Sequence, residues 1–111
     1  MSVYYPWNAP DVADELDSSE KLLATFEALK QYEKTFHFIG QSSIKIAKDE
    51  RSAKAYVYTI AHHVLSNEKE GKSLMIAYLR YDDEFVKAIN GEWKFSHRVL
   101  HADFIENRVL S

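Results

Sequence analysis

The chain has 111 residues, of which 46% are hydrophobic and 28% are charged, a composition that predicts one globular domain over residues 1–111 and excludes a disordered chain. Its 14 basic and 17 acidic residues are interspersed and give a net charge of −3, which argues against a nucleic-acid partner. There is no cysteine and no apolar run of the roughly 18 residues that a membrane span requires, so the sequence predicts a cytoplasmic protein that does not cross a membrane.

The first elements are a short strand and a helix. Val3–Trp7 is a β-prone aromatic run that ends at a proline-containing loop. Asp17 and Glu20 have the spacing of a capping box, and apolar residues then recur at helical spacing. We therefore expect one amphipathic helix from about Ser18 to Glu33.

Four long β-branched or aromatic runs follow, and we expect each to be a strand: Thr35–Ile46, Ala53–Leu65, Leu74–Val86 and Trp93–Phe104. Charged turns over residues 48–51 and 67–71 separate the first three, and Asn90-Gly91 is a strong hairpin signal before the last. Short turns between consecutive strands predict an antiparallel meander. The expected fold class is α+β, a curved antiparallel sheet of about five strands packed on one helix.

A single helix is too narrow to cover such a sheet. Five strands span about 20 to 25 Å, whereas a helix is about 10 Å across. The remainder of that face must be wet, be covered by another subunit, or be covered by a segment that longer relatives possess. We therefore expect a homo-oligomer, either a dimer or a trimer.

Two stretches resemble a known family. They are the strand start Phe36-His37-Phe38-Ile39-Gly40-Gln41 and the hairpin from Tyr81 to Lys94. With the order strand, helix and four long strands, they resemble the SnoaL-like branch of the NTF2-like superfamily, which includes scytalone dehydratase and lindane dehydrochlorinase. The resemblance covers about Val3 to Phe104 and implies a cone-shaped sheet with a pocket inside.

The resemblance also implies roles for two residues. In catalytic members, the histidine matching His37 acts with an aspartate to remove a proton from carbon as a leaving group departs. Arg98 matches, less closely, a pocket arginine of some dehydrochlorinases. In the family two helices precede the first strand and supply the aspartate. The chain is expected to lack them, so the aspartate has no counterpart, and a neighbouring subunit's Asp11, Asp14 or Glu15 is the candidate replacement.

His37 and Arg98 each have a second interpretation from the residues themselves. An unperturbed imidazole titrates near pH 6.5, so His37 can take and return a proton, or it can be a structural histidine bonded to a carbonyl or a tyrosine. Arg98 is expected to share a face with Lys94, Ser96 and Leu100, where it could hold an anionic group or pair with Glu84 or Asp103 at the surface.

Strand alternation predicts the lining of a pocket around His37. Small side chains at its centre leave volume, and one end of the helix supplies a wall, although the same residues could form a dry core. The expected substrate-binding residues are Phe26, Tyr32, Thr35, Tyr58, Thr59, Met75, Ala77, Leu79 and Tyr81. Leu29 is expected in the helical wall, and Val57 and Ala61 are expected to point inward beside Thr59.

Two functions remain open. One is a cofactor-independent lyase, dehydratase or isomerase with His37 as general base and Tyr32, Tyr58 or Arg98 polarising a hydrophobic substrate. The other is a ligand-binding or assembly protein without catalysis. No cofactor or metal is expected. His62 and His63 point to opposite faces, so they cannot bind one metal together. His97, His101 and Asp103 could form a metal site with a histidine of a neighbouring strand, but such a group is more often a solvated or subunit-contact face. The acidic run Asp82-Asp83-Glu84 is expected to lie on the solvent-facing outside of a strand bend or hairpin.

Overall fold

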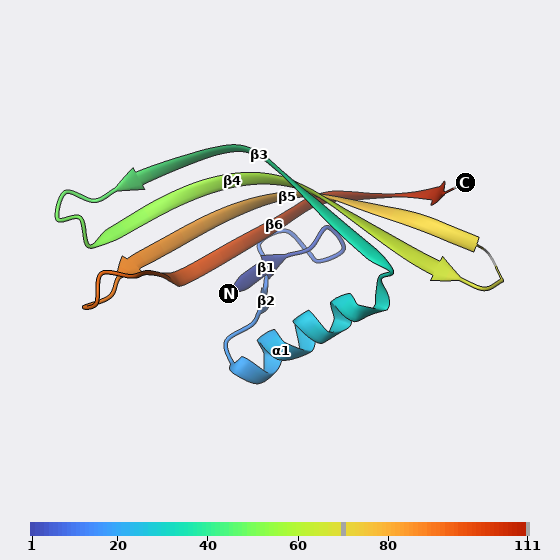
Figure 1. The fold of residues 1–111 in the computed structure, drawn as a ribbon, viewed down its shortest axis with the longest axis horizontal. Coiled ribbons are helices and arrows are strands. Elements are labelled where there is room, and N and C mark those ends of the chain that lie inside the picture. The colour runs from blue at the N-terminus through green and yellow to red at the C-terminus, as the bar shows by residue number, and fades with distance from the viewer. Residues whose placement is uncertain (70, 111) are drawn as a thin grey trace.

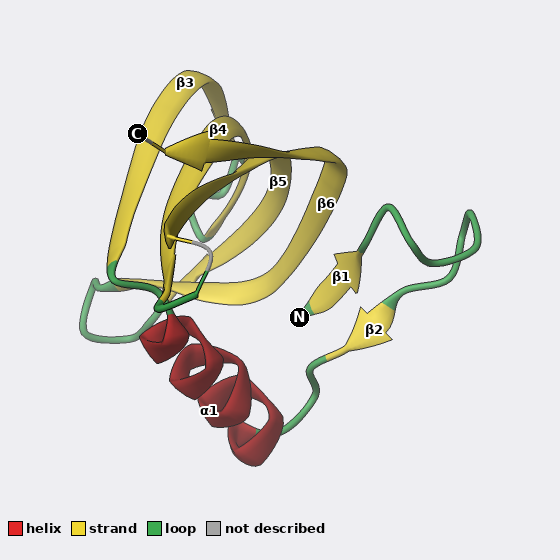
Figure 2. Ribbon diagram, turned by 90° about the vertical axis from the view of Figure 1, so that its right-hand side faces the viewer, coloured by secondary structure: helices red, strands yellow, loops and turns green. Residues whose placement is uncertain are grey.

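The computed structural model describes residues 1–69 and 71–110 and contains one curled sheet with a helix at its open side (Figures 1 and 2). Glu70, in the second predicted turn, lies outside the described residues. The strands run in the order β2-β1-β6-β5-β4-β3 across the sheet. Their bounds are Ser2–Tyr4 (β1), Asp14–Glu15 (β2), Lys34–Ile46 (β3), Ser52–Asn67 (β4), Gly71–Lys87 (β5) and Trp93–Leu110 (β6).

The four long strands, β3 to β6, confirm the predicted antiparallel meander. The sheet is larger than expected, with six strands rather than about five. The opening strand does not continue the meander, because β1 pairs in parallel with β6 and antiparallel with the two-residue β2. Since β2 is so short, it leaves no alternating pattern that could be recognised in the sequence.

The Asn90-Gly91 turn forms as predicted. Gly91 has a φ of 86°, a conformation that glycine adopts without steric cost, and the side chain of Asn90 accepts a hydrogen bond from the Glu92 amide at 3.0 Å. The Ala88 amide closes the turn by donating to the carbonyl of Glu92 at 2.7 Å. The turn therefore fixes the register between β5 and β6.

Bulges interrupt the regular pairing and bend the sheet. The register shifts between Ile39 and Ser42 on β3. On β6, Ser96 and Asp103 are the extra residues, because Phe85 pairs with Phe95 while Glu84 pairs with His97, and a second shift occurs after Tyr78. Bulges increase local twist and strand bending, which is consistent with the curl seen in Figure 2.

Helix α1 (Ser19–Ala28) is shorter than predicted and is followed by a 3₁₀ turn, η1 (Leu29–Gln31). Its N-cap is Ser18 rather than Asp17, because the Ser18 hydroxyl accepts from the Lys21 amide at 3.2 Å. Asp17 instead accepts from the Lys21 ammonium group at 2.8 Å. None of the α1 side chains is buried, so the helix lies below the sheet without being packed on it (Figure 1).

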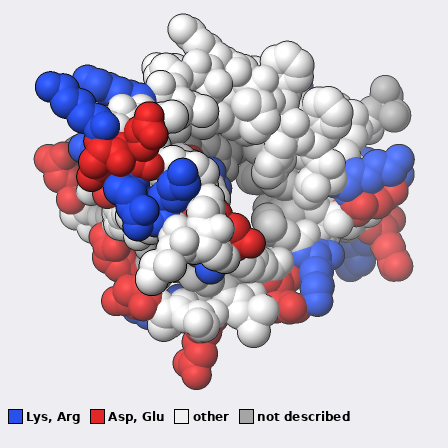
Figure 3. All heavy atoms as spheres, turned by 60° about the vertical axis from the view of Figure 1, so that its left-hand side comes forward, with Lys and Arg blue, Asp and Glu red and all other residues white. Residues whose placement is uncertain are grey.

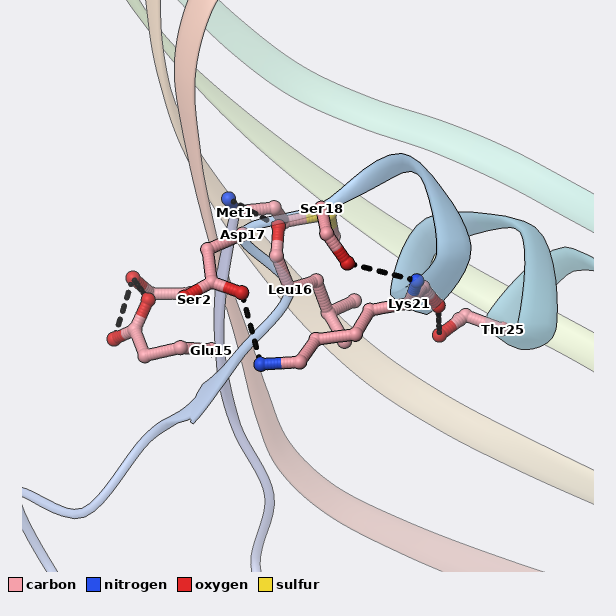
Figure 4. Close-up of polar contacts among 8 residues, drawn as sticks. All are labelled: Met1, Ser2, Glu15, Leu16, Asp17, Ser18, Lys21 and Thr25. Carbon is pink, nitrogen blue, oxygen red and sulfur yellow. Dashed lines mark hydrogen bonds and ion pairs between the residues drawn. The ribbon is translucent and has the colours of Figure 1, made fainter.

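The segment before α1 is held by polar contacts, shown in Figure 4. The amino group of Met1 donates to the Leu16 carbonyl at 3.1 Å, and the Leu16 amide donates to the Met1 carbonyl at 2.7 Å. The Ser2 hydroxyl contacts both carboxylate oxygens of Glu15, at 2.9 and 2.7 Å. These contacts fasten the chain leading into α1 to the edge of the sheet.

Most of the core lies on one face of the sheet, whereas Ile76, which is also buried, faces the other side, between His62 and Glu106. Along β4 buried residues alternate with more exposed ones, and the buried set includes Ala53, Ala55, Thr59, Ala61 and His63. We call this side the inner face, and the opposite side, which carries Tyr56, Tyr58 and His62, the outer face. Because most buried side chains are small, the inner face is shallowly filled.

Candidate functional site

A cluster of three rings lies on the inner face where η1 leads into β3. The His37 ring lies 5.6 Å from the His63 ring at an interplanar angle of 81°, and the Tyr32 ring lies 4.7 Å from His63. The Tyr32 hydroxyl is 4.0 Å from the sulfur of Met75. The β3–β4 pairing positions this cluster, because His37 lies opposite Ala61 and Thr35 lies opposite His63.

His63 is a candidate site residue that the sequence reasoning missed. Its side chain is 7% exposed, and its Nδ1 atom has no hydrogen-bond partner in the part of the chain that the structure describes. Burial lowers the pKa of His63, and the neighbouring His37 and His62 lower it further. The ring is therefore held neutral, as a proton acceptor must be. Alternation gave the signal, since His62 and His63 point to opposite faces as predicted and one of them must point inward.

Thr59 carries a second unpartnered polar atom on the same face. Thr59 is 2% exposed and its Oγ1 has no partner among the described residues, while Ala61 and Ala77 beside it are buried and small. A buried hydroxyl or imidazole without a hydrogen bond costs about 1 to 3 kcal/mol. A third unpartnered atom among the described residues, His62 Nδ1, lies on the outer face of the same strand. The two on the inner face favour a polar group that approaches from that side.

Arg98 lies on the inner face, but with neighbours other than those predicted. Its guanidinium donates to both oxygens of Asp83 at 2.7 and 3.0 Å, and its Cζ atom lies 4.2 Å from the Tyr81 ring centroid and 4.6 Å from that of Phe95. The prediction that Arg98 shares a face with Ser96 was wrong, because the bulge at Ser96 puts Phe95 and Arg98 on one side. The Asp83 hydrogen bond raises the pKa of Arg98, and burial raises the pKa of Tyr81.

Asp83 corrects the interpretation of the acidic run as exterior. Its side chain is 2% exposed, and its partner is the Arg98 guanidinium rather than solvent. The predicted partners of Arg98, Glu84 and Asp103, pair with other residues: Glu84 lies 3.8 Å from Lys54, and Asp103 is paired with Arg80 at 2.6 Å. Arg98 thus neutralises a buried carboxylate and is not free to meet a ligand anion.

The structure does not bring His37 and Arg98 together. His37 pairs with Ala61 on β4, which in turn pairs with Ala77 on β5. Arg98 pairs with Asp83, which lies six positions further along β5 than Ala77. Six residues of a strand span roughly 20 Å, longer than a small substrate. The ring cluster and the Arg98 cluster are therefore separate groups on the inner face.

The other predicted lining residues fall into two sets. Thr35, Met75, Ala77, Leu79 and Tyr81 pair within the inner-face rows, as do Val57 and Ala61. Phe26 and Leu29 are 60% and 43% exposed, so they form no packed wall in this structure. Tyr58 is a correction, because it lies next to the buried Thr59, is 50% exposed, and therefore belongs to the outer face.

The remaining candidates are distributed elsewhere. His101 lies 3.5 Å from Asp82, and among the described residues no group of three His, Asp or Glu side chains could hold a metal ion.

Two open cavities, about 530 and 540 Å³, lie outside the ring cluster. Within the parts of the chain described, no helix is both long and apolar enough to cross a membrane.

The three carboxylates proposed as replacements for the missing aspartate lie before α1. Asp14 accepts a hydrogen bond from the Asn8 amide group at 3.2 Å, and Glu15 is bonded to Ser2. Asp11 has a positive φ of 66°. Among the described residues, none of these three carboxylates forms a hydrogen bond or ion pair with Tyr32, His37 or His63, so within one chain they do not complete a dyad with His37.

Comparison with solved structures shows the fold. A protein of Novosphingobium aromaticivorans, named provisionally as a scytalone dehydratase, is 23% identical, with a TM-score of 0.71 over 99% of this chain and 68% of its own. The Kfla4162 protein of Kribbella flavida is 21% identical, with a TM-score of 0.66 over 96% of this chain and 71% of its own. No curated protein sequence is similar enough to count as a relative.

A family match covers most of the chain. The SnoaL-like domain matches residues 4–99, from the end of β1 to the middle of β6. This range includes the ring cluster, the Asp83 and Arg98 pair, and the inner-face residues of β3, β4 and β5 between them. The chain therefore belongs to the SnoaL-like domain family, with the α+β, NTF2-like fold that its sequence predicted.

Proposed function

We propose that the inner face binds a small hydrophobic or aromatic molecule with one or two polar groups. The observation that carries this proposal is that two buried atoms on a face lined by small side chains, Thr59 Oγ1 and His63 Nδ1, have no hydrogen-bond partner within residues 1–69 and 71–110. A ligand hydroxyl or carbonyl would relieve the cost of leaving either atom unpaired. Tyr32 and Met75 add an apolar and aromatic border, which suits a flat ligand better than a sugar.

The reaction that best fits this site is a cofactor-independent elimination or isomerisation. In an elimination, a neutral imidazole takes a proton from carbon, the C–H electron pair becomes the new double bond, and the leaving group departs with its own pair. His37 is the proposed base, since it lies exposed at the edge of the cluster, and the buried His63 is the neutral ring beside it. The likeness to a protein named as a scytalone dehydratase supports a lyase of this class.

The alternative is a ligand-binding protein without catalysis. Its support is that His37 has no carboxylate beside it among the contacts of the described residues, whereas a catalytic dyad needs one to orient the imidazole.

We also propose a homo-oligomer and a cytoplasmic location. The exposed apolar side chains of α1 and of the sheet support the homo-oligomer. The absence of cysteine from the sequence supports the cytoplasmic location, where disulfides are rare.

A thermal-shift screen of aromatic and terpenoid alcohols, ketones and halides tests the pocket. A ligand at about 100 times its dissociation constant should stabilise the protein by about 2.7 kcal/mol. Thr59→Phe fills the centre of the inner face and should abolish the shift, while Ile89→Phe, at a fully exposed position, serves as the matched control. Stabilisation by anionic sugars or phosphates alone would contradict the proposal.

Catalysis is tested separately from binding. A ligand that stabilises the protein should be converted to a dehydrated, dehydrohalogenated or isomerised product, detected by mass spectrometry. Loss of turnover in His37→Ala with retained binding would support the enzyme. Binding without any turnover would favour the alternative.

A further inference from the structure

An open cavity lies at the end of the sheet away from the ring cluster, next to the β3–β4 and β5–β6 turns. Its volume is about 530 Å³, within the usual range of small-molecule pockets. Lys54, which lines this cavity, is nine residues along β4 from His63, a strand length of about 30 Å. We call the cavity the end groove, and its lining includes Lys45, Ala47, Ser52, Lys54, Val86 and Ser96.

Two lysines of the end groove lie directly opposite each other. Lys45 of β3 pairs in register with Lys54 of β4. Both belong to the outer face, because Ala53 and Ala55, on either side of Lys54, are buried on the inner face. Directly opposed residues have Cβ atoms about 4.5 to 5.5 Å apart, and like charges in such a pair repel each other. An anion between the two ammonium groups would turn this repulsion into attraction.

The protein supplies only part of the compensating negative charge. Glu84, the next residue in the same row, lies 3.8 Å from Lys54, whereas Lys45 has no ion-pair partner in the part of the chain that the structure describes. Residues 45–54 and 84–94 carry six basic and four acidic side chains, a local charge of +2 on a chain whose net charge is −3. In Figure 3, which turns this end of the sheet toward the viewer, basic groups lie beside both acidic groups and uncharged surface.

A row of small and apolar side chains lies beside the lysine row. Ser52 pairs in register with Val86, and the Ala47 amide donates to the Ser52 carbonyl at 2.9 Å, which places these three residues side by side. Val86 is 43% exposed, so it offers apolar surface that is free to be covered. The hydroxyl groups of Ser52 and Ser96 add two hydrogen-bond donors to the lining. The end groove therefore combines uncompensated positive charge with adjacent apolar surface.

We propose that the end groove binds a small amphipathic anion, a molecule with one anionic group and a short apolar body. The anionic group lies between the ammonium groups of Lys45 and Lys54 and accepts charge-assisted hydrogen bonds from them. The apolar body lies along Ala47, Ser52 and Val86. The proposed inner-face ligand is a neutral molecule on the other side of the sheet, so the two sites differ in both position and chemistry.

Amide NMR titration of the full chain with sodium octanoate, at constant ionic strength, tests this site. Octanoate should shift the amide signals of Ala47, Ser52 and Val86. Acetate, which lacks the tail, and 1-octanol, which lacks the charge, should each bind about 10-fold more weakly. Lys45→Gln and Lys54→Gln should each weaken octanoate binding by about 10-fold, the factor that one charge-assisted hydrogen bond contributes. Lys34→Gln, which removes an exposed lysine from the other end of β3, is the matched control and should leave the affinity unchanged.

Thr59→Phe separates this site from the inner face. Because Thr59 lies on the inner face, its replacement should abolish binding of the neutral ligand and leave octanoate binding intact. Octanoate binding that is lost in Thr59→Phe but kept in both lysine variants would place octanoate on the inner face and overturn the proposal. Equal affinity for octanoate and 1-octanol, or no octanoate binding at all, would overturn it as well. Neither of these two results would bear on the neutral ligand of the inner face.

Discussion

The Arg98 guanidinium spans both oxygens of the Asp83 carboxylate while Tyr81 and Phe95 flank it, with Arg98 Cζ 4.2 and 4.6 Å from the two ring centroids. Asp83 is almost completely buried, at 2% side-chain exposure, whereas Arg98 retains 34%. The Arg98 guanidinium therefore neutralises the buried negative charge of Asp83. Two cation–π contacts hold the guanidinium in place.

Removing the arginine should be costly for stability. Arg98→Met leaves the Asp83 carboxylate buried without a cation, and such a change typically costs about 3 to 5 kcal/mol. The measurement is urea denaturation at neutral pH. Arg98→Met combined with Asp83→Leu should recover most of the loss, because no buried charge remains. A single variant as stable as the wild type would show that Asp83 reaches solvent.

Acid should destabilise the protein through His63. Burial holds the folded-state pKa of His63 below its ordinary value of 6.5, so below pH 6.5 the unfolded chain binds more protons than the folded one. The stability that depends on neutral His63 is fully present above pH 6.5 and falls as the pH drops through that value. Urea denaturation from about pH 7.5 to 5.5 should show this slope.

Variants isolate that pH dependence. His63→Phe should flatten the slope, and His97→Phe, at an exposed position on β6, should not change it. The paired carboxylates do not interfere, because hydrogen bonds to Arg80 lower the pKa of Asp103 and hydrogen bonds to Tyr78 and Arg108 lower that of Glu106. The stability that these two ionised carboxylates contribute to the protein is lost only at a more acidic pH, as each carboxylate becomes protonated. A slope that persists in His63→Phe would assign it to another group.

Replacing His37 should affect the site and leave the fold intact. His37 is exposed, so His37→Ala should change the free energy of unfolding by no more than about 0.5 kcal/mol. Ligand affinity or turnover should fall markedly. Parallel thermal melts and ligand titrations separate the two effects. A melting temperature several degrees lower with unchanged binding would make His37 part of the scaffold.

Helix α1 should be the least protected helix or strand of the free protein. It has 10 residues and no buried side chain, and isolated helices shorter than about 12 to 15 residues are marginal in water. Amide hydrogen exchange should be faster in α1 than in β4 and β5. A ligand on the inner face should slow it if Phe26 and Leu29 close over that ligand. Equal protection of α1 and β4 in the free protein would contradict this expectation.

The long strands and the Asn90-Gly91 turn could be predicted because local residue preference and side-chain alternation determine them. The face of Arg98 could not, since a one-residue bulge at Ser96 reverses alternation and leaves no clear mark in the sequence. The helical period of α1 predicted an apolar stripe correctly, yet periodicity does not show whether the stripe is covered. Alternation from Thr59 and Ala61 places His63 inward, but the adjacent histidines were considered only as a pair of metal ligands, so His63 was missed as a single inward ring.

Strand β3 forms a free edge of the sheet, and a free edge can pair with strands of other molecules and so promote aggregation. Strand β3 ends the strand order and is exposed along all 13 residues, so one row of its backbone groups faces outward, ready to pair with another strand. The bulge between Ile39 and Ser42 divides this edge into two shorter segments, and Lys34 and Lys45 place a positive charge near each end. An uninterrupted edge of this length, rich in phenylalanine and isoleucine, would be a template for fibril growth. The bulge that bends the sheet therefore also disfavours uncontrolled strand addition.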